Sequence, residues 1–317
     1  MNTVLVTGAN GFIGSAILTK LQLNEQYRIR GAVRKSSRPY PDDIHVYDGL
    51  ELASNTDWMS ALSSVDVVIH CAARAHLLRD TSADPLADFR RVNTEGTRNL
   101  ALQAAQAGVK RFIFLSSLGV NGAETTSKPF TASDIPNPHS PYAQSKLEAE
   151  VALLKLAQKT DMSVVIVRPP LVYGPNAPGN FGVLCRLVQK GLPLPLGWIN
   201  NRRSFISVDN LVDLICRCID HPNAANQVFL ASDGEDLSTT ELLKKMGVAF
   251  EQRLLLVPIP VPVLKLGAQL LGKSKQAQQL LGSLQVDIEK TKLALDWRPP
   301  FSVEQGLRKT AEYWQKA

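Results

Sequence analysis

Three polar side chains, Ser117, Tyr142 and Lys146, have the types and the spacing needed for proton exchange with a carbinol or ketone oxygen. Tyr142 and Lys146 stand four residues apart in "SPYAQSKLEAE", which predicts that they share one face of a helix. A neighbouring ammonium favours the phenolate and lowers the pKa of a phenol from its usual value of about 10. Ser117 ends the apolar run "FIFLSS" and would hold the substrate oxygen by a hydrogen bond. The three residues therefore predict acid–base chemistry, with Tyr142 carrying the proton.

A glycine-rich turn, "VLVTGANGFIG", stands near the start of the chain. Gly8, Gly11 and Gly14, with Phe12 and Ile13 among them, follow an apolar strand and open a helix. Glycines let the backbone approach a pyrophosphate closely, and a helix N-terminus offers unpaired N–H groups and a partial positive charge. In this strand–turn–helix context the spacing predicts a dinucleotide-binding turn.

The end of the second expected strand bears on the choice of dinucleotide. An acidic residue there would bind the ribose hydroxyls of NAD, whereas a cation accommodates the additional phosphate of NADP. This sequence has "GAVRKSSR", with Arg34, Lys35 and Arg38 and no acidic residue. These cations favour NADP(H) over NAD(H); a solvated basic loop is the alternative interpretation.

Alternating strands and helices must position these residues. β-Branched runs predict strands over 3–8, 27–33, 65–73, 110–117 and 162–170. Helical patterns lie between them, over 12–23, 84–108 and 140–158. This order predicts an α/β fold of Rossmann type, with a doubly wound parallel sheet and a smaller mixed C-terminal lobe. We expect residues 1–170 to form the dinucleotide-binding domain, with 205–231 returning to it, and residues 171–317 to form mainly a substrate-binding lobe.

Composition narrows the classes of partner. The chain has 317 residues and a net charge of +6, but its basic residues are scattered, which argues against a nucleic-acid partner. The four cysteines show no metal-ligand spacing, so no metal site is expected. We expect a cytoplasmic protein without a transmembrane segment, because prolines interrupt the most apolar stretch, residues 254–272. This stretch is expected to cover part of the core; contact with a membrane or a lipid-bearing substrate is the alternative.

Stretches along nearly the whole chain resemble the extended short-chain dehydrogenase/reductase family of nucleotide-sugar epimerases, dehydratases and 4-ketoreductases. They include "TGANGFIG", "VNTEGT", "SPYAQSK", "RPPLVYGP" and "RRSFISVDN". The resemblance implies that Ser117, Tyr142 and Lys146 are the catalytic trio and that Lys146 also holds the nicotinamide ribose. It further implies cofactor contacts from Asp48, Ala72, Ala73 and Asn93, and diphosphate contacts from Asn180 and Arg203.

The same resemblance bears on the reaction. Dehydratases of the family carry an Asp-Glu pair where this chain has Leu118 and Gly119, so dehydration is disfavoured. Hydride transfer at the sugar 4-position remains, with 4-keto reduction slightly favoured over 4-epimerisation, in bacterial surface polysaccharide synthesis. Leu171 stands where sugar-modifying relatives often have Asn, which weakens the assignment of a sugar substrate.

Other hypotheses stay open. One is an NADPH-dependent reductase of a hydrophobic ketone, of the dihydroflavonol or hydroxysteroid type, which would use the apolar segment 254–271. Another is a non-catalytic NADP-binding scaffold, against which the intact trio argues. The resemblance also implies a homodimer to which the helix of Tyr142 contributes.

Overall fold

A seven-stranded parallel sheet forms the larger part of the protein in the computed structural model, which describes residues 2–36, 39–75 and 83–316. The strand order is β3-β2-β1-β4-β5-β6-β9, and every neighbouring pair is parallel. The strands are β1 (Asn2–Thr7), β2 (Tyr27–Ala32), β3 (His45–Tyr47), β4 (Val67–His70), β5 (Arg111–Leu115), β6 (Ser163–Arg168) and β9 (Gln227–Leu230). The Rossmann-type fold expected from the sequence is confirmed.

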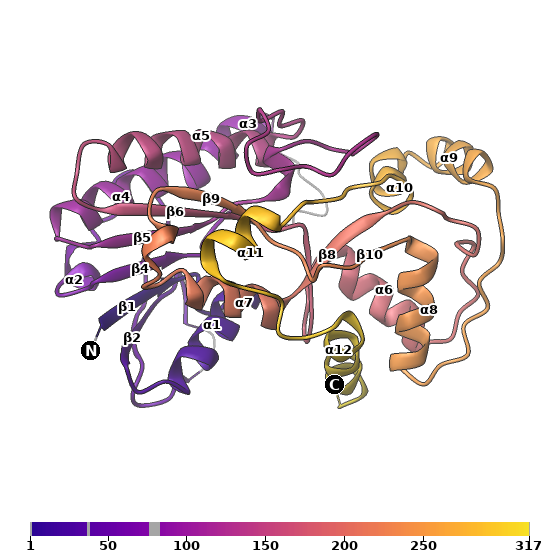
Figure 1. Cartoon of the computed structure of the whole chain (residues 1–317), viewed down its shortest axis with the longest axis horizontal. Coiled ribbons are helices and arrows are strands. Elements are labelled where there is room, and N and C mark those ends of the chain that lie inside the picture. Colours follow the sequence, from indigo (N-terminus) through magenta and orange to yellow (C-terminus); the bar gives the residue numbers. More distant parts are fainter. Residues whose placement is uncertain (1, 37–38, 76–82, 317) are drawn as a thin grey trace.

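Helices cover both faces of this sheet (Figure 1). One face carries α1 (Phe12–Gln22), α7 (Val208–Arg217) and α11 (Glu289–Leu295), and the other carries α2 (Met59–Leu62), α4 (Thr97–Gln106) and α5 (Pro141–Ala157). Alternate residues of β1 pack on opposite sides: Val4 and Val6 belong to the core under α1, and Leu5 to the core under α4 and α5. The sheet is therefore buried on both sides, which explains its continuous apolar runs.

The expected helix over 84–108 is interrupted. The structure has α3 (Pro85–Phe89), then a wide π-helical turn η1 (Arg90–Gly96), and then α4. Gly96 ends this turn against a neighbouring loop, where a Cβ would lie 2.8 Å from the backbone of Leu52. The helical pattern expected over 84–108 is thus confirmed from Pro85 to Gln106, with a π-helical turn inside it, a feature often found at functional sites.

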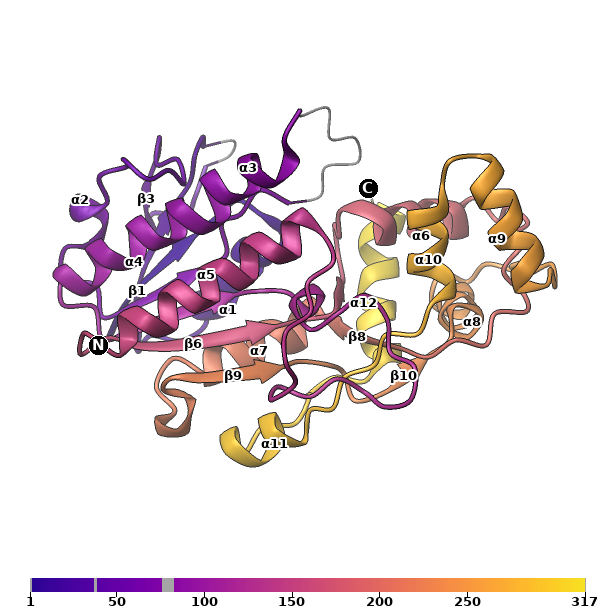
Figure 2. The ribbon, with the colours of Figure 1, turned by 90° about the horizontal axis from the view of Figure 1, so that it is seen from above.

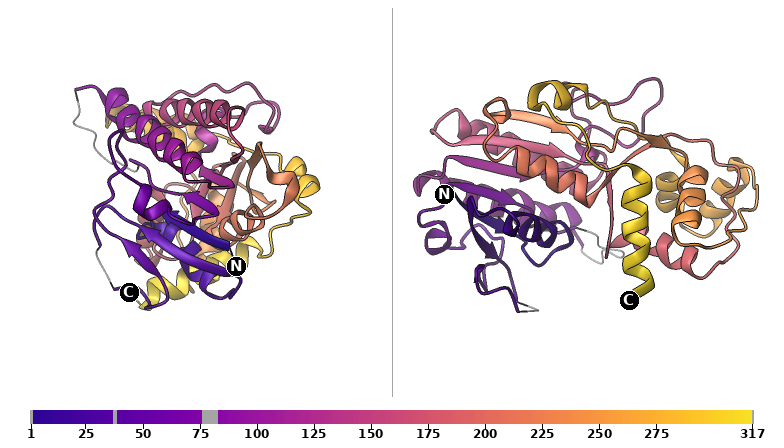
Figure 3. Two further views of the ribbon diagram at one scale, coloured as in Figure 1. Left: turned by 90° about the vertical axis from the view of Figure 1, so that its left-hand side faces the viewer. Right: turned by 60° about the horizontal axis from the view of Figure 1, so that its bottom comes forward.

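The C-terminal part forms a second, smaller unit around the three-stranded sheet β10-β8-β7. Its elements are β7 (Leu171–Tyr173), β8 (Arg203–Ser207), β10 (Asp236–Leu237), α6 (Gly179–Gln189), α8 (Thr239–Ala249), α9 (Val261–Leu270), α10 (Ser274–Leu281) and α12 (Val303–Lys316). Its apolar core includes Phe181, Leu243 and Leu307. Figure 3 (right) shows α12 standing between the large sheet and the other helices of this lobe. The helix α8 begins with a capping box formed by Ser238 and Glu241.

The apolar stretch 254–272 covers the core only at its start, where Leu254 and Leu256 pack against the core of the lobe. The helix α9 has no buried residue, although the structure describes its full length. The lobe obtains its core from α6, α8 and α12 instead, and this leaves α9 on the outside (Figure 2). None of the described helices combines the length and apolar character needed to cross a bilayer.

Candidate active site

The glycine-rich turn between β1 and α1 is packed so closely that it excludes side chains. Gly8 has a φ of +66°, and a Cβ there would lie 2.9 Å from the backbone nitrogen of Ala72. A Cβ at Gly14 would lie 2.2 Å from the carbonyl oxygen of Gly8, and one at Gly11 would lie 3.1 Å from it. Gly11 precedes α1 and has no capping side chain, so the first N–H groups of the helix stay available. This cradle fits the pyrophosphate of a dinucleotide.

Phe12 and Ile13 open α1 with their side chains turned into the protein. Both are half-buried and pack against the main core, and Phe12 also contacts the core of the C-terminal lobe. What these two residues can offer a bound pyrophosphate is therefore their backbone N–H groups rather than their side chains.

The loop after β2, which carries the basic residues, lies beside a carboxylate that follows β3. Arg34 and Lys35 are exposed, while Arg38 lies outside the described residues. Asp48, which follows β3, accepts hydrogen bonds of 2.8 Å from the backbone N–H groups of Ser36 and Gly49. Asp48 is thus bound to the loop after β2 that also carries Arg34 and Lys35.

Residues after β4 form the next part of the site. Ala72 and Ala73 are half-buried, and the Ala72 N–H donates to Thr7 Oγ1 at 3.3 Å. Asn93, in η1, is 1% exposed. Its Oδ1 accepts from the Arg74 N–H at 2.8 Å, and its Nδ2 donates to Ser145 Oγ at 3.1 Å. Asn93 therefore joins the loop after β4 to α5.

The helix α5 carries Tyr142 and Lys146 on one face, as the spacing predicted. Ser140 caps its N-terminus. The ring of Tyr142 contacts that of Phe89 edge to face, with 5.9 Å between centroids. Lys146 is 2% exposed, and its Nζ lies 4.0 Å from the ring centroid of Phe114.

Burial dominates the electrostatics of this pair. It raises the pKa of Tyr142 to about 12 and lowers the pKa of Lys146 to about 7. Glu150 and Cys71 act in the opposite direction on the Lys146 pKa. The expectation that Lys146 lowers the pKa of Tyr142 is wrong for this structure, because burial raises that pKa. Near neutral pH Tyr142 is therefore a phenol.

Ser117 lies directly beside the first turn of α5. It follows β5 and caps the short 3-10 helix η2 (Leu118–Val120), where its Oγ accepts from the Gly119 N–H at 3.1 Å. A Cβ at Gly119 would lie 3.3 Å from the Cβ of Ala143. The structure thus brings the turn that holds Ser117 against the turn of α5 that holds Tyr142. Neither Leu118 nor Gly119 supplies a carboxylate.

A buried polar network beneath the trio was not predicted. Glu150 Oε1 accepts from Ser116 Oγ and, at 2.9 Å, from Arg168 Nε; its Oε2 accepts from Arg168 Nη2 at 2.5 Å. Arg168 Nη1 also donates to Asn121 Oδ1 at 3.0 Å. Glu150 stands one turn after Lys146, and Ser116 precedes Ser117, so the network fixes both halves of the site. The available signal was a carboxylate on the apolar face of α5.

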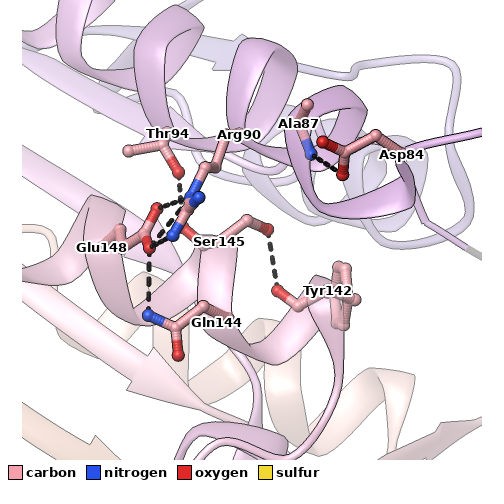
Figure 4. A network of polar contacts seen from close by, with 8 residues as sticks. All are labelled: Asp84, Ala87, Arg90, Thr94, Tyr142, Gln144, Ser145 and Glu148. Carbon is pink, nitrogen blue, oxygen red and sulfur yellow. Dashed lines mark hydrogen bonds and ion pairs between the residues drawn. The ribbon is translucent and has the colours of Figure 1, made fainter.

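A second network joins η1 to the outer side of α5 (Figure 4). Arg90 donates to Glu148 through Nε and Nη2, at 2.9 and 2.7 Å. Thr94 Oγ1 donates to the Ser145 carbonyl at 3.0 Å, and Ser145 Oγ donates to the Tyr142 carbonyl at 2.8 Å. These bonds hold the backbone at Tyr142 in place.

Arg203 and Asn180 reach the same segment of the C-terminal lobe from two elements. Arg203 begins β8, and its Nη1 donates to the Gly282 carbonyl at 2.8 Å. Burial lowers the pKa of Arg203 to about 10, and Glu124 opposes this shift. Asn180, at the start of α6, is exposed and donates to Gln279 Oε1 at 2.5 Å. A largely desolvated guanidinium of this kind suits an anionic ligand.

Comparison of the sequence with known proteins gives matches over most of the chain. The family model described as "NAD dependent epimerase/dehydratase family" matches residues 4–231. A curated relative, UDP-glucose 4-epimerase from Vibrio cholerae, is 46% identical over 317 residues, which cover 99% of this chain and 96% of the relative.

Solved structures are similar over the same length. UDP-glucose 4-epimerase from Thermotoga maritima, solved with UDP-glucose, is 25% identical, with a TM-score of 0.79 and 99% of each chain covered. UDP-glucuronic acid 4-epimerase from Bacillus cereus, solved with NAD, is 20% identical with a TM-score of 0.79 and the same coverage, and this likeness concerns the fold alone.

Proposed function

This chain belongs to the NAD dependent epimerase/dehydratase family, and from this membership we propose that it transfers hydride at the 4-position of a nucleotide sugar, with Tyr142 as acid and base. The family resemblance drawn from the sequence is confirmed. The observation that carries the proposal is the packing of the Ser117 turn against the first turn of α5. This packing gathers a hydroxyl donor, a phenol and a buried ammonium.

Reduction of a 4-keto sugar is the favoured reaction. When bound, the reduced nicotinamide supplies the hydride. As the ketone carbon becomes a carbinol, its oxygen gains negative charge and takes the phenol proton of Tyr142, while Ser117 donates a hydrogen bond to that oxygen. The raised pKa of Tyr142, about 12, supports this direction because the group is protonated near neutrality.

Epimerisation at the 4-position is the second candidate. It is favoured by the 46% identity to UDP-glucose 4-epimerase from Vibrio cholerae. It requires Tyr142 first to accept the hydroxyl proton as a phenolate and later to return it. Dehydration is disfavoured because Leu118 and Gly119 cannot act as acid or base.

We propose that the dinucleotide lies on the cradle of Gly8, Gly11 and Gly14, and that NADP(H) is favoured over NAD(H). Arg34 and Lys35, exposed after β2, support the preference for the additional phosphate. Asp48 beside them would oppose it. Titration with NADPH and NADH tests this: Arg34→Ala should weaken NADPH binding about tenfold or more and leave NADH binding unchanged. Equal affinities of the native protein for both cofactors would contradict the preference.

The nucleotide diphosphate is assigned to the C-terminal lobe, through Arg203 and Asn180. We keep the division into a cofactor part, residues 1–170 with 205–231, and a substrate part, mainly 171–317. The desolvated guanidinium of Arg203 supports this assignment. A reductase of hydrophobic ketones would not need an arginine that binds a diphosphate. The nucleotide-sugar hypothesis and the hydrophobic-ketone hypothesis therefore predict different results for nucleotide binding. Thermal stabilisation by UDP or dTDP favours the nucleotide-sugar substrate, and the lack of any such shift disfavours it.

The decisive experiment incubates the protein with NADPH or NADH and a panel of UDP-linked 4-keto sugars, and follows loss of the reduced cofactor. UDP-glucose without added cofactor tests epimerisation, with the product identified by chromatography. Tyr142→Phe should abolish turnover and leave cofactor binding intact, whereas Tyr313→Phe, at an exposed position of α12, is the matched control. Turnover by Tyr142→Phe would refute the assignment, and inactivity of the native protein on every substrate would favour a non-catalytic scaffold.

We further propose a homodimer through the groove between α4 and α5. This groove measures about 440 Å³ and includes the apolar residues Leu102 and Val151, which are 38% and 43% exposed. Light scattering tests the oligomeric state, and Val151→Glu should yield a monomer.

The proposed setting of the reaction is the cytoplasm, in the synthesis of bacterial surface polysaccharide. A strain in which the gene is deleted tests this proposal, because it should lose the polymer.

A further inference from the structure

The helix α9 carries a stripe of apolar side chains on its outer side. Val263, Leu266 and Leu270 recur at helical spacing and are 57%, 59% and 80% exposed. We call these three residues the α9 stripe. Contiguous exposed apolar side chains of this kind mark an interaction surface more often than single exposed residues do.

The segment of the sequence that carries the stripe contains cations and no acidic residue. The segment from residue 252 to residue 286 contains Arg253, Lys265, Lys273 and Lys275, and neither Asp nor Glu. The chain as a whole has 29 acidic residues against 35 basic ones, so this segment is unusual within it. Arg253, Lys265 and Lys273 are exposed. An exposed apolar stripe among cations is complementary to a surface that is both apolar and anionic.

The polar side of α9 faces the rest of the lobe. Lys265 and Gln269 line a groove of about 270 Å³ together with Glu124 and Gly282. The Gly282 carbonyl is also the acceptor for Arg203. In Figures 1 and 2, α9 lies at the outer end of the lobe, on the far side of α10 from the large sheet. The stripe is therefore presented away from the body of the protein.

We propose that the α9 stripe and its flanking cations bind an anionic phospholipid surface. The apolar side chains would enter the boundary between headgroups and acyl chains, and the exposed cations outside the groove, Arg253 and Lys273, would meet the phosphates of anionic lipids. A second copy of the chain is a poorer occupant. A two-fold contact through the stripe would set like cations against one another, with no carboxylate in the segment to pair with them. The proposal does not depend on the catalytic assignment.

The test is sedimentation of the full chain with vesicles of phosphatidylcholine alone or mixed with equal phosphatidylglycerol, at low and high salt. The native protein should sediment with the mixed vesicles at low salt, and less at high salt. Lys273→Gln should weaken binding about fivefold, whereas Lys265→Gln, on the side of α9 that faces the lobe, should have little effect. Leu266→Glu with Leu270→Glu should weaken it more than tenfold.

The matched control is Leu23→Glu with Leu293→Glu, since both leucines are 81% exposed outside the lobe, Leu23 directly after α1 and Leu293 on α11. This control should bind vesicles as the native protein does. The proposal is overturned if the native protein ignores anionic vesicles, or if the stripe variant and the control lose binding equally. It is also overturned if light scattering shows that Leu266→Glu with Leu270→Glu dissociates an oligomer while vesicle binding is unchanged.

Discussion

Replacing Glu150 with Ala should lower the free energy of unfolding by about 3–5 kcal/mol, because it leaves the guanidinium of Arg168 buried without its carboxylate. The side chains of Glu150 and Arg168 are 2% and 5% exposed, so water cannot take over the lost contacts without rearrangement. The guanidinium would keep Asn121 as an acceptor, and Ser116 would lose its partner. Arginine stays protonated in proteins, so it cannot escape the cost by losing its charge.

A matched control lies on the same helix. Glu148 pairs with Arg90 at 2.7 Å, but these side chains are 26% and 45% exposed. Solvent screens such a pair, so Glu148→Ala should cost only about 0–1 kcal/mol. Urea unfolding followed by circular dichroism measures both variants. Equal losses for Glu150→Ala and Glu148→Ala would refute the reasoning that burial, rather than pairing itself, sets the cost.

A double variant distinguishes the effect of the ion pair itself from the effect of leaving one buried charge unpaired. Glu150→Ala combined with Arg168→Met removes both charges, so it should be more stable than Glu150→Ala alone. Strict additivity of the two single losses would mean that the carboxylate and the guanidinium act independently. That result would contradict the network described beneath the site.

Three further predictions concern the site. Gly14→Ala should abolish dinucleotide binding in titration calorimetry, because its Cβ would lie 2.2 Å from a backbone carbonyl oxygen; Gly267→Ala, with open space around it, is the control that should bind normally. The pKa of Lys146 is about 7 in the folded protein and 10.5 for an ordinary lysine. Between pH 7 and pH 10.5 the unfolded chain therefore binds more protons at this residue than the folded chain does. The contribution of Lys146 to the free energy of unfolding consequently rises with pH over this range. Lys146→Met should therefore stabilise the protein most below pH 7, and this gain should shrink by roughly 1.4 kcal/mol per pH unit above it; a gain independent of pH in urea unfolding contradicts the burial argument. Arg203→Met should weaken UDP binding about tenfold or more, whereas Arg202→Met, at the exposed neighbouring position, should not. Equal losses of affinity in calorimetry would contradict the assignment of Arg203 to the diphosphate.

The sequence by itself determined the features that depend on near neighbours in the chain. The glycine turn, the capping box of Ser238 and Glu241, and the shared face of Tyr142 and Lys146 all follow from spacings of a few residues. Such spacings set backbone geometry and side-chain direction directly, because helices and tight turns repeat over the same distance. The alternation of buried strands and helices likewise predicted the parallel sheet and five of its strands.

Only the tertiary structure decided which distant segments meet and which surfaces lose water. It paired Glu150 with Arg168, brought Asp48 to the loop after β2, and widened the helix before α4. It also raised the pKa of Tyr142 where the sequence predicted a lowered one, and it left α9 outside a core that other helices fill. Desolvation and packing depend on the whole set of neighbours around a group, and residues far apart in the chain supply most of that set.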